Sequence, residues 1–311
     1  MSLALLPQAP VWVLDDPRSP AGGPASAIAG RLGLPFRRLD SAPGQPHRPG
    51  GPGPGLVLSA GTASGLRALL LRSRHGCRVV HCATRALTLP RTATWLPFDL
   101  TVLPHGVFQA PAQPETSRFI PVLGTPNVVS PGLLARARDL WAERLSHLPH
   151  PRVLLLFGGT DQKAALALGQ RLSAMARERG GCVMASVLPS GAHAADALAV
   201  GLAGCLHLIY REGEPGEDPT LGFLGHADAV VAAGVGERTL SEACAAAVPI
   251  FATLLGTERR DIRALIARMV QADQIRMLAD DLSPWPRQPL DEAGRIAREI
   301  RLRFGKSAGR E

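Results

Sequence analysis

The sequence predicts an α/β protein whose domains are built on mostly parallel sheets. Short apolar runs typical of strands alternate with helical segments along the whole chain. Turns rich in glycine or other small residues follow several of these runs. The length of 311 residues suits one large domain or two ordinary ones. The segment Pro149-His-Pro151 lies between a helix and a strong strand, so we expect two domains, 1–150 and 151–311.

In the first domain, the apolar run Val11–Leu14 is the expected first strand, and it leads through a loop into a helix over 25–32. The Pro- and Gly-rich stretch 41–55 has nothing to bury and is expected to be a surface loop. By the same alternation we expect further strands at 35–39, 56–59, 78–82 and 98–103, and helices at 66–74 and 131–145.

The second domain repeats this pattern, beginning with a strand over 152–157 and a long helix over 163–179. The acidic segment 211–219 is expected to be a mobile, solvated loop. We expect the remaining strands at 182–187, 206–209, 227–233 and 250–255, and helices at 192–202, 220–226, 239–247, 259–272 and 291–304.

The composition is that of a globular protein, with 46% hydrophobic and 19% charged residues. The longest apolar stretches are strand-sized, and the first residues lack the pattern of a secretion signal, so we expect a cytoplasmic protein. Five cysteines lie at wide spacings without a Cys-x-x-Cys pair. They predict reduced core thiols and no structural metal site.

A formal net charge of +8 favours an anionic partner. The basic residues are almost all arginines, which indicates a base-composition bias, and the charge is expected to be spread along the chain. Without a basic stripe interleaved with aromatic residues, a nucleic acid is not expected as a partner. An anionic membrane surface, contacted peripherally at its cytoplasmic face, and a phosphorylated substrate both remain compatible with this charge.

The stretch 234–249 carries the strongest functional signal. Gly234 and Gly236 form a tight turn between a strand and a helix, where unpaired amides and the helix dipole favour an anion such as a diphosphate. Thr239 and Glu242 follow three residues apart on one helical face. A carboxylate there can accept hydrogen bonds from two neighbouring hydroxyls of a ribose or sugar ring. The alternative is that the glycines serve packing alone and the glutamate complements the dipole.

Gly158, Gly159 and Thr160 follow a strand and precede a helix in the same way, and they form a second candidate phosphate cradle. The turn has neither the G-x-G-x-x-G order of dinucleotide sites nor the G-K-[ST] of a P-loop.

Three residues at strand ends of the first domain are further candidates. Arg85 has a guanidinium that matches phosphate oxygens. Asp16 and His105 are candidate bases that would deprotonate an acceptor hydroxyl. The alternative for each is a polar side chain that solvates its loop.

The second half resembles the nucleotide-sugar half of the bacterial peptidoglycan N-acetylglucosaminyltransferase. The likeness rests on Gly158-Gly-Thr160, Ala227-Asp-Ala-Val-Val231, and Gly236-x-x-Thr239-x-x-Glu242-Ala243 followed by Pro249, in that order. It implies the GT-B architecture, with two Rossmann-like domains facing a cleft. It also implies that Glu242 holds the ribose, and that Gly158, Gly159, Gly236 and Thr239 contact the diphosphate.

Over nearly the whole chain, the sequence is more similar to a bacterial and plant family of glycosyltransferase-like proteins that includes a plant mitochondrial fission factor (Elm-type). The matching segments are Val11–Asp15, Phe98–His105, Leu224–Val231, Leu240–Cys244 and Pro289–Ala293. The segment 235–239 departs from the usual Asp-Ser-x-Ser-Met run of that family. This departure implies a different donor or acceptor, or a member that has lost activity.

Together these signals predict a metal-independent glycosyltransferase that takes a nucleotide-diphosphate sugar as donor substrate, needs no separate cofactor, and acts in cell-envelope glycan synthesis. The second domain is expected to bind the donor and the first the acceptor. Two alternatives stay open. One is a sugar-nucleotide 2-epimerase of the same architecture, and the other is a non-catalytic adaptor that contacts membranes through the basic terminal helix.

Overall fold

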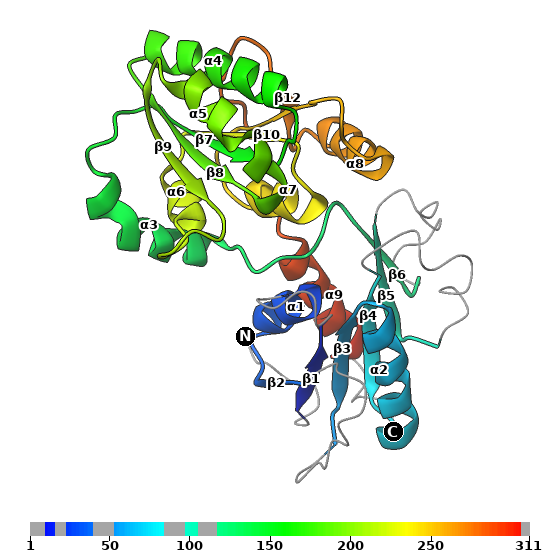
Figure 1. The fold of residues 1–311 in the computed structure, drawn as a ribbon. Coiled ribbons are helices and arrows are strands. Elements are labelled where there is room, and N and C mark those ends of the chain that lie inside the picture. The colour runs from blue at the N-terminus through cyan, green and yellow to red at the C-terminus, as the bar shows by residue number, and fades with distance from the viewer. Residues whose placement is uncertain (1–9, 16–22, 40–52, 84–96, 105–116, 306–311) are drawn as a thin grey trace. The chain divides into compact units, whose positions relative to one another are not determined.

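The fold is described from a computed structural model, which describes residues 10–15, 23–39, 53–83, 97–104 and 117–305. The chain divides into two compact units. The first comprises Met1–Val128 together with Asp291–Glu311, and the second comprises Val129–Leu290. Within the described residues, each unit contains one six-stranded sheet in which all neighbouring strands are parallel (Figure 1). The predicted fold class, two Rossmann-like α/β domains built on parallel sheets, is confirmed.

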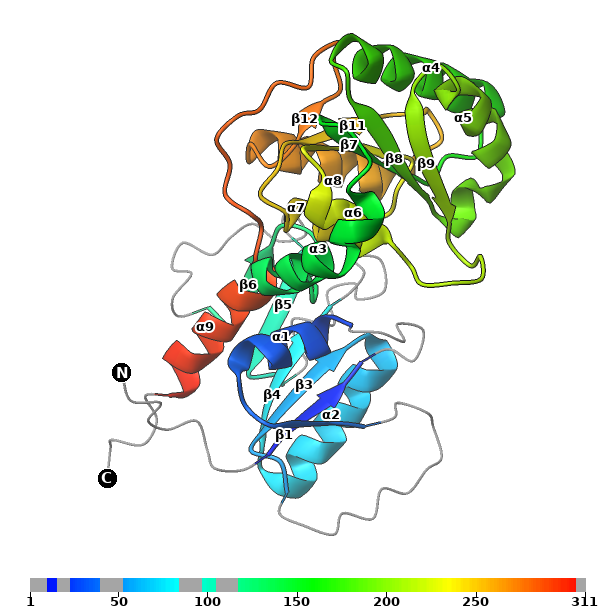
Figure 2. The same cartoon turned by 90° about the vertical axis from the view of Figure 1, so that its left-hand side faces the viewer.

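The sheet of the first unit has the strand order β2-β1-β3-β4-β5-β6. One face is covered by α1 and α9, and the other by α2 (Figure 2). The strands are β1 (Val11–Leu14), β2 (Phe36–Arg38), β3 (Leu56–Ala60), β4 (Arg78–Cys82), β5 (Leu100–Pro104) and β6 (Phe119–Val122). The helices are α1 (Pro24–Leu32), α2 (Thr62–His75) and α9 (Glu292–Phe304).

The sheet of the second unit has the strand order β12-β11-β10-β7-β8-β9. Its strands are β7 (Arg152–Phe157), β8 (Cys182–Val187), β9 (Leu206–Arg211), β10 (Ala229–Ala233), β11 (Ile250–Thr253) and β12 (Arg276–Met277). Its α-helices are α3 (Pro131–Leu145), α4 (Gln162–Glu178), α5 (Ala195–Leu202), α6 (Thr220–His226), α7 (Glu237–Cys244) and α8 (Arg260–Gln271), and a 3₁₀ helix spans Pro189–Ala194. The central strands β7, β8 and β10 are buried along their whole length, which explains their continuous apolar sequences.

The two units do not follow the expected division into 1–150 and 151–311. The second unit begins earlier, at Val129, and the chain returns to the first unit at Asp291. Helix α3 packs against α6 and so belongs to the second unit. Helix α9 belongs to the first unit, where Ile296 and Ile300 are fully buried in the core beneath α1. Local sequence patterns show that these helices are amphipathic, but they do not show which sheet each apolar face will cover.

The strands β6 and β12 were not expected from the sequence. Both lie at an edge of their sheet, and β12 has only two residues. An edge strand contacts one neighbour and buries little, so its sequence lacks the continuous apolar run that marks a central strand.

Charge is divided unevenly between the units, although we expected it to be spread along the chain. The first unit has 18 basic and 9 acidic residues, a formal net charge of +9, whereas the second has 16 basic and 17 acidic residues, a net charge of −1. The excess positive charge of the protein therefore belongs to the first unit.

No helix in the described part of the chain is long and apolar enough to cross a membrane. All five cysteines are free thiols, and four of them are buried. Burial raises the pKa of the Cys182 thiol to about 11 and that of Cys244 to about 12, so both are held in the thiol form within the core.

Candidate functional site

The second sheet has a topological switch point between β7 and β10. The chain enters the sheet at β7, continues to β8 and β9 on one side, and then returns to β10, β11 and β12 on the other. Adjacent loops therefore diverge at the carboxyl ends of β7 and β10. Parallel α/β sheets bind ligands in the crevice at such a point.

The two glycine turns singled out in the sequence meet at this switch point. The amide of Gly158 donates to the carbonyl of Ala233 at 2.9 Å. A Cβ atom on Gly158 would lie 2.6 Å from the carbonyl oxygen of Gly234, and one on Gly234 would lie 2.7 Å from the amide nitrogen of Gly159. Gly234 also has a φ of +64°. Only glycine allows the two backbones to approach this closely.

Helix α7 begins directly beyond the second turn, with Gly236 as its N-cap residue. Gly236 is exposed and has no side chain to accept hydrogen bonds from the first turn. Helix α4, which follows the first turn, is different, because the Asp161 carboxylate caps it by accepting from the Ala164 amide at 2.7 Å. The positive end of α7, unlike that of α4, therefore has no capping side chain.

Thr239 and Glu242 lie in the first two turns of α7, and both are half-buried. The side chain of Glu242 is 26% exposed, and its Oε1 accepts from Nε of Arg238 at 2.9 Å. The arginine lies one turn earlier in the same helix, and its side chain is 49% exposed. An exposed pair of this kind is weak and readily exchanged. The Glu242 carboxylate can therefore turn to another donor with little cost.

The carboxyl end of α7 is fixed by the half-buried guanidinium of Arg287. Nη1 of Arg287 donates to the carbonyl of Val248 at 2.9 Å, and Nη2 donates to the carbonyl of Cys244 at 2.6 Å. A guanidinium at this position satisfies the last carbonyls of the helix and complements its dipole. This arrangement holds α7, and with it Gly236 and Glu242, in a defined position against the sheet.

Three polar residues at the same edge were missed from the sequence. A Cβ atom on Gly158 would lie 2.9 Å from Oγ of Ser190, an exposed residue of the 3₁₀ helix after β8. In the same helix, the exposed His193 has Nε2 3.4 Å from the side-chain amide of Gln162 at the start of α4. The segment after β8 has no glycine pair or motif of its own, so only the strand order reveals its proximity to Gly158.

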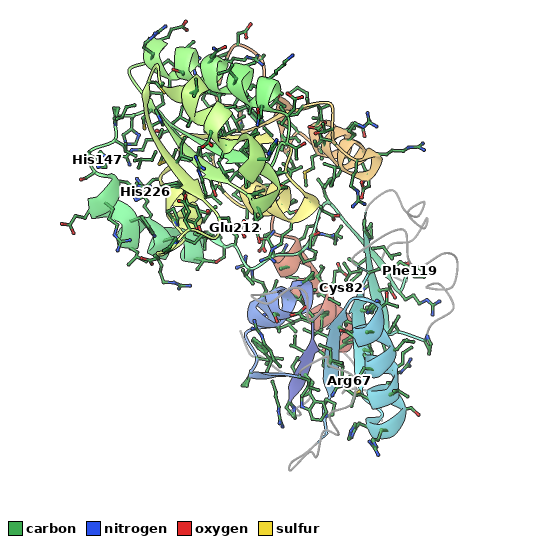
Figure 3. The ribbon with its side chains drawn as sticks, viewed as in Figure 1. Arg67, Cys82, Phe119, His147, Glu212 and His226 are labelled. Carbon is green, nitrogen blue, oxygen red and sulfur yellow. The ribbon has the colours of Figure 1, made fainter. Side chains whose placement is uncertain are left out.

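His226, labelled in Figure 3, is near the glycine turn in sequence but not in space. It precedes β10, and so it lies at the amino edge of the sheet, at the end opposite Gly234. Its Nδ1 is 3.1 Å from Nη1 of Arg152, and its Nε2 is 2.8 Å from the carbonyl of Arg138. Burial lowers the pKa of His226, with a smaller contribution from Arg152. The histidine is thus neutral and links α3 to the sheet.

The first unit has its own switch point, between β1 and β3, where α2 begins at Gly61 without a capping side chain and a carboxylate caps α1. Oδ1 of Asp15 accepts from the amide of Ala25, and Oδ2 from the amide of Ser26, both at 3.0 Å. The Ser26 hydroxyl also donates to Oδ2. Asp15 therefore caps α1, and both of its carboxylate oxygens accept hydrogen bonds from the start of this helix. The candidates Asp16, Arg85 and His105 lie outside the described residues.

A buried polar pair lies near the carboxyl edge of the first sheet. Oγ of Ser59 and Nδ1 of His81 are 2.9 Å apart, and both residues are almost completely buried. The imidazole stacks on Phe98, with ring centroids 4.5 Å apart. Burial lowers the pKa of His81 to about 4, so this histidine is neutral at physiological pH.

Comparison with known proteins gives the same architecture. The family model for mitochondrial fission ELM1 matches residues 8–304. No curated protein sequence matches significantly. The UDP-GlcNAc 2-epimerase of Methanocaldococcus jannaschii is similar with a TM-score of 0.55 at 13% identity, covering 94% of this chain and 98% of that one.

Two further solved structures are similar over nearly their whole length. The UDP-GlcNAc 2-epimerase of Neisseria meningitidis, bound to UDP-GlcNAc, gives a TM-score of 0.53 at 11% identity, with 93% and 97% of the two chains covered. A glycosyltransferase from Rickettsia africae gives 0.50 at 9% identity, with 96% and 94% covered. At these identities the likeness shows a shared fold.

Proposed function

This chain belongs to the mitochondrial fission ELM1 family, and we propose that it is a glycosyltransferase whose second unit binds a nucleotide-diphosphate sugar. The observation that carries the proposal is the meeting of the two glycine turns at the switch point, beside the start of α7. The close approach of Gly158 and Gly234 places backbone without side chains at the sheet edge, where Gly234 is half-buried and Gly236 is exposed. Bare backbone amides at a helix start favour an anion such as a diphosphate.

In this proposal, the diphosphate lies against Gly158, Gly159, Thr160, Gly234 and Gly236 at the start of α7. The Gly158 amide already donates to the carbonyl of Ala233, so the amides of the other four residues, the helix dipole and the hydroxyl of Thr239 stabilise its charge. In this arrangement the diphosphate charge is stabilised without a bound metal ion.

The carboxylate of Glu242 is proposed to accept hydrogen bonds from the two ribose hydroxyls. It lies on α7 beyond Thr239, and its present partner Arg238 is an exposed residue that water can replace. Hydrogen bonds from sugar hydroxyls to a half-buried carboxylate are charge-assisted and strong.

The acceptor is proposed to bind the first unit, with Asp16 or His105 as the base that removes its proton and Arg85 as an anion contact. The excess positive charge of that unit suits an acceptor carrying phosphate. An acceptor used in cell-envelope glycan synthesis fits this description.

Measurement of nucleotide affinity for two variants tests the donor site. Glu242→Ala and Arg238→Ala both break the ion pair within α7, but only the first removes the carboxylate. We expect Glu242→Ala to weaken binding of UDP-GlcNAc in calorimetry by about ten- to a hundredfold, the value of charge-assisted hydrogen bonds. Arg238→Ala is expected to leave the affinity unchanged or slightly higher. Equal affinity in Glu242→Ala and the parent protein would show that the ribose is held elsewhere.

A 2-epimerase is the second candidate, because two proteins of the same fold are UDP-GlcNAc 2-epimerases. Incubation with UDP-GlcNAc alone separates the two activities. An epimerase yields an isomerised nucleotide sugar without an acceptor, whereas a glycosyltransferase leaves the donor intact or releases UDP only when an acceptor or water takes the sugar.

A further inference from the structure

We propose that α2 of the first unit binds the surface of an anionic lipid bilayer, through exposed leucines flanked by arginines. Helix α2 covers one face of the first sheet, opposite α1 and α9 (Figure 2). This inference does not depend on the proposed transfer reaction.

The outward face of α2 carries two large apolar side chains among its polar ones. Leu66 and Leu70 are 56% and 72% exposed, and they lie four residues apart, one above the other on the helix. The inward face buries Ser64, Gly65 and Ala68, and Leu69 and Leu71 pack against the core beside them. The helix therefore turns two large aliphatic side chains to the outside, which is typical of helices that lie in a bilayer interface.

The charge around these leucines is strongly positive. Helix α2 contains Arg67, Arg72 and Arg74 and no acidic residue; Figure 3 labels Arg67. Arg72 lies 3.6 Å and Arg78 3.0 Å from the carboxylate of Asp99, so two guanidiniums share one buried charge. Arg74 is exposed. Basic side chains beside exposed leucines complement the anionic headgroups of a membrane.

The terminal helix α9, where the sequence suggested a membrane contact, is less suited to it. Nη2 of Arg301 donates to the carbonyls of Arg31 and Leu32, at 2.8 and 2.7 Å, and so caps the end of α1. Arg295 and Arg303 donate to the backbone of Pro121 and Ser117. Three of the four arginines of this helix are thus engaged in holding it to its own unit.

The same observations disfavour two other occupants of the α2 face. Two copies of the chain joined through α2 would bring like charges together, which costs free energy. Nucleic-acid surfaces pair basic side chains with aromatic ones, and α2 contains no Phe, Trp or Tyr. Leucines beside arginines match a bilayer, which offers headgroup charge and hydrocarbon at the same surface.

Co-sedimentation of the full chain with vesicles tests the proposal. We expect binding to vesicles of phosphatidylcholine mixed with phosphatidylglycerol, weaker binding to phosphatidylcholine alone, and a decrease as salt is raised. The double variant Leu66→Ser and Leu70→Ser should bind at least about tenfold more weakly. Arg74→Gln should bind about fivefold more weakly. All three positions are at the surface, so the fold is expected to persist, and circular dichroism checks this.

The matched control is Leu302→Ser on α9, a leucine of similar exposure, 57%, on the opposite face of the same unit. It is expected to bind vesicles as the parent protein does. Equal binding by the α2 variants and the parent, or equal loss in Leu302→Ser, would overturn the assignment to α2.

A dimer in sedimentation velocity that the α2 variants abolish would show that a second copy covers this face instead. UDP-GlcNAc affinity, measured in parallel, reports on the second unit, so failure of either proposal is recognised separately.

Discussion

The two units have similar sheets, but they differ at their switch points. In the first unit, the carboxylate of Asp15 occupies the start of the helix after β1 and accepts the amides of Ala25 and Ser26. In the second unit, the glycine turns leave the start of α7 without a capping side chain. In both units an aspartate caps the helix after the first strand, Asp15 for α1 and Asp161 for α4, and the helix across the switch point, α2 or α7, begins at a glycine without a capping side chain. The difference is in the first turn: a Cβ atom on Gly23 would meet the Asp15 carboxylate, whereas one on Gly158 would meet the backbone of Gly234. A side chain thus fills the turn in the first unit, and two backbones meet in the second.

The difference in net charge follows the same division. The second unit, with a net charge of −1, would attract an anion through local backbone geometry, since its overall charge offers no attraction. The first unit, with +9, would attract an anionic surface through its total charge. Local geometry selects a small ligand with a defined shape, whereas net charge favours a broad, salt-sensitive contact.

The largest expected effect comes from closing the second switch point with a side chain. Gly234→Ala places a Cβ 2.7 Å from the Gly159 amide at a φ of +64°. We expect a loss of about 3 kcal/mol in the stability of the second unit, from steric overlap and left-handed strain together. Hydrogen exchange of the strand amides measures this for each unit. Gly132→Ala in α3, where a Cβ meets nothing within 4 Å, is the control and should cost nothing. A fully stable Gly234→Ala protein would contradict the close approach.

The second prediction is that the stability of the first unit depends on pH through the buried His81. The pKa of His81 is about 4 in the folded state and 6.5 in the reference state, so folding favours the neutral ring. Stability is therefore complete above pH 6.5 and falls as the pH drops towards 4, by up to about 3 kcal/mol in this unit.

The variant His81→Gln should remove this part of the pH dependence, although it lowers stability at neutral pH by loss of packing. The exposed His147→Gln, which lies in the second unit (Figure 3), controls for the exchange of a histidine. An unchanged slope in His81→Gln between pH 6.5 and 4 would show that another group is responsible.

The smallest effect concerns the cap of the first unit. Asp15→Asn keeps one acceptor oxygen but turns an amide group towards the donors of Ser26. We expect a loss of about 1–2 kcal/mol, concentrated in the hydrogen-exchange protection of α1. Asp280→Asn is the control, because its side chain is 99% exposed and its ion pair with Arg171 contributes little. Equal protection of α1 in both variants would mean that the carboxylate does not support the helix.

Sequence patterns identified most central strands because those strands are buried on both faces. The runs at β7, β8 and β10 are apolar throughout, and each is followed by a turn of small or polar residues. The same patterns gave the glycine turns and Glu242 as candidate site residues, because the geometry of a turn is a local property. Edge strands such as β12 bury too little to leave such a signal.

What the sequence by itself determined is the set of local elements: the central strands, the glycine turns, and the short helix that carries Thr239 and Glu242. Only the tertiary structure decided which elements become neighbours. The strand order brings Gly158 against Gly234 and Ser190, places His226 at the far edge, and assigns α9 to the first unit. The physical reason is that local conformation depends on a few adjacent residues, whereas neighbours in space depend on how all apolar faces are buried together.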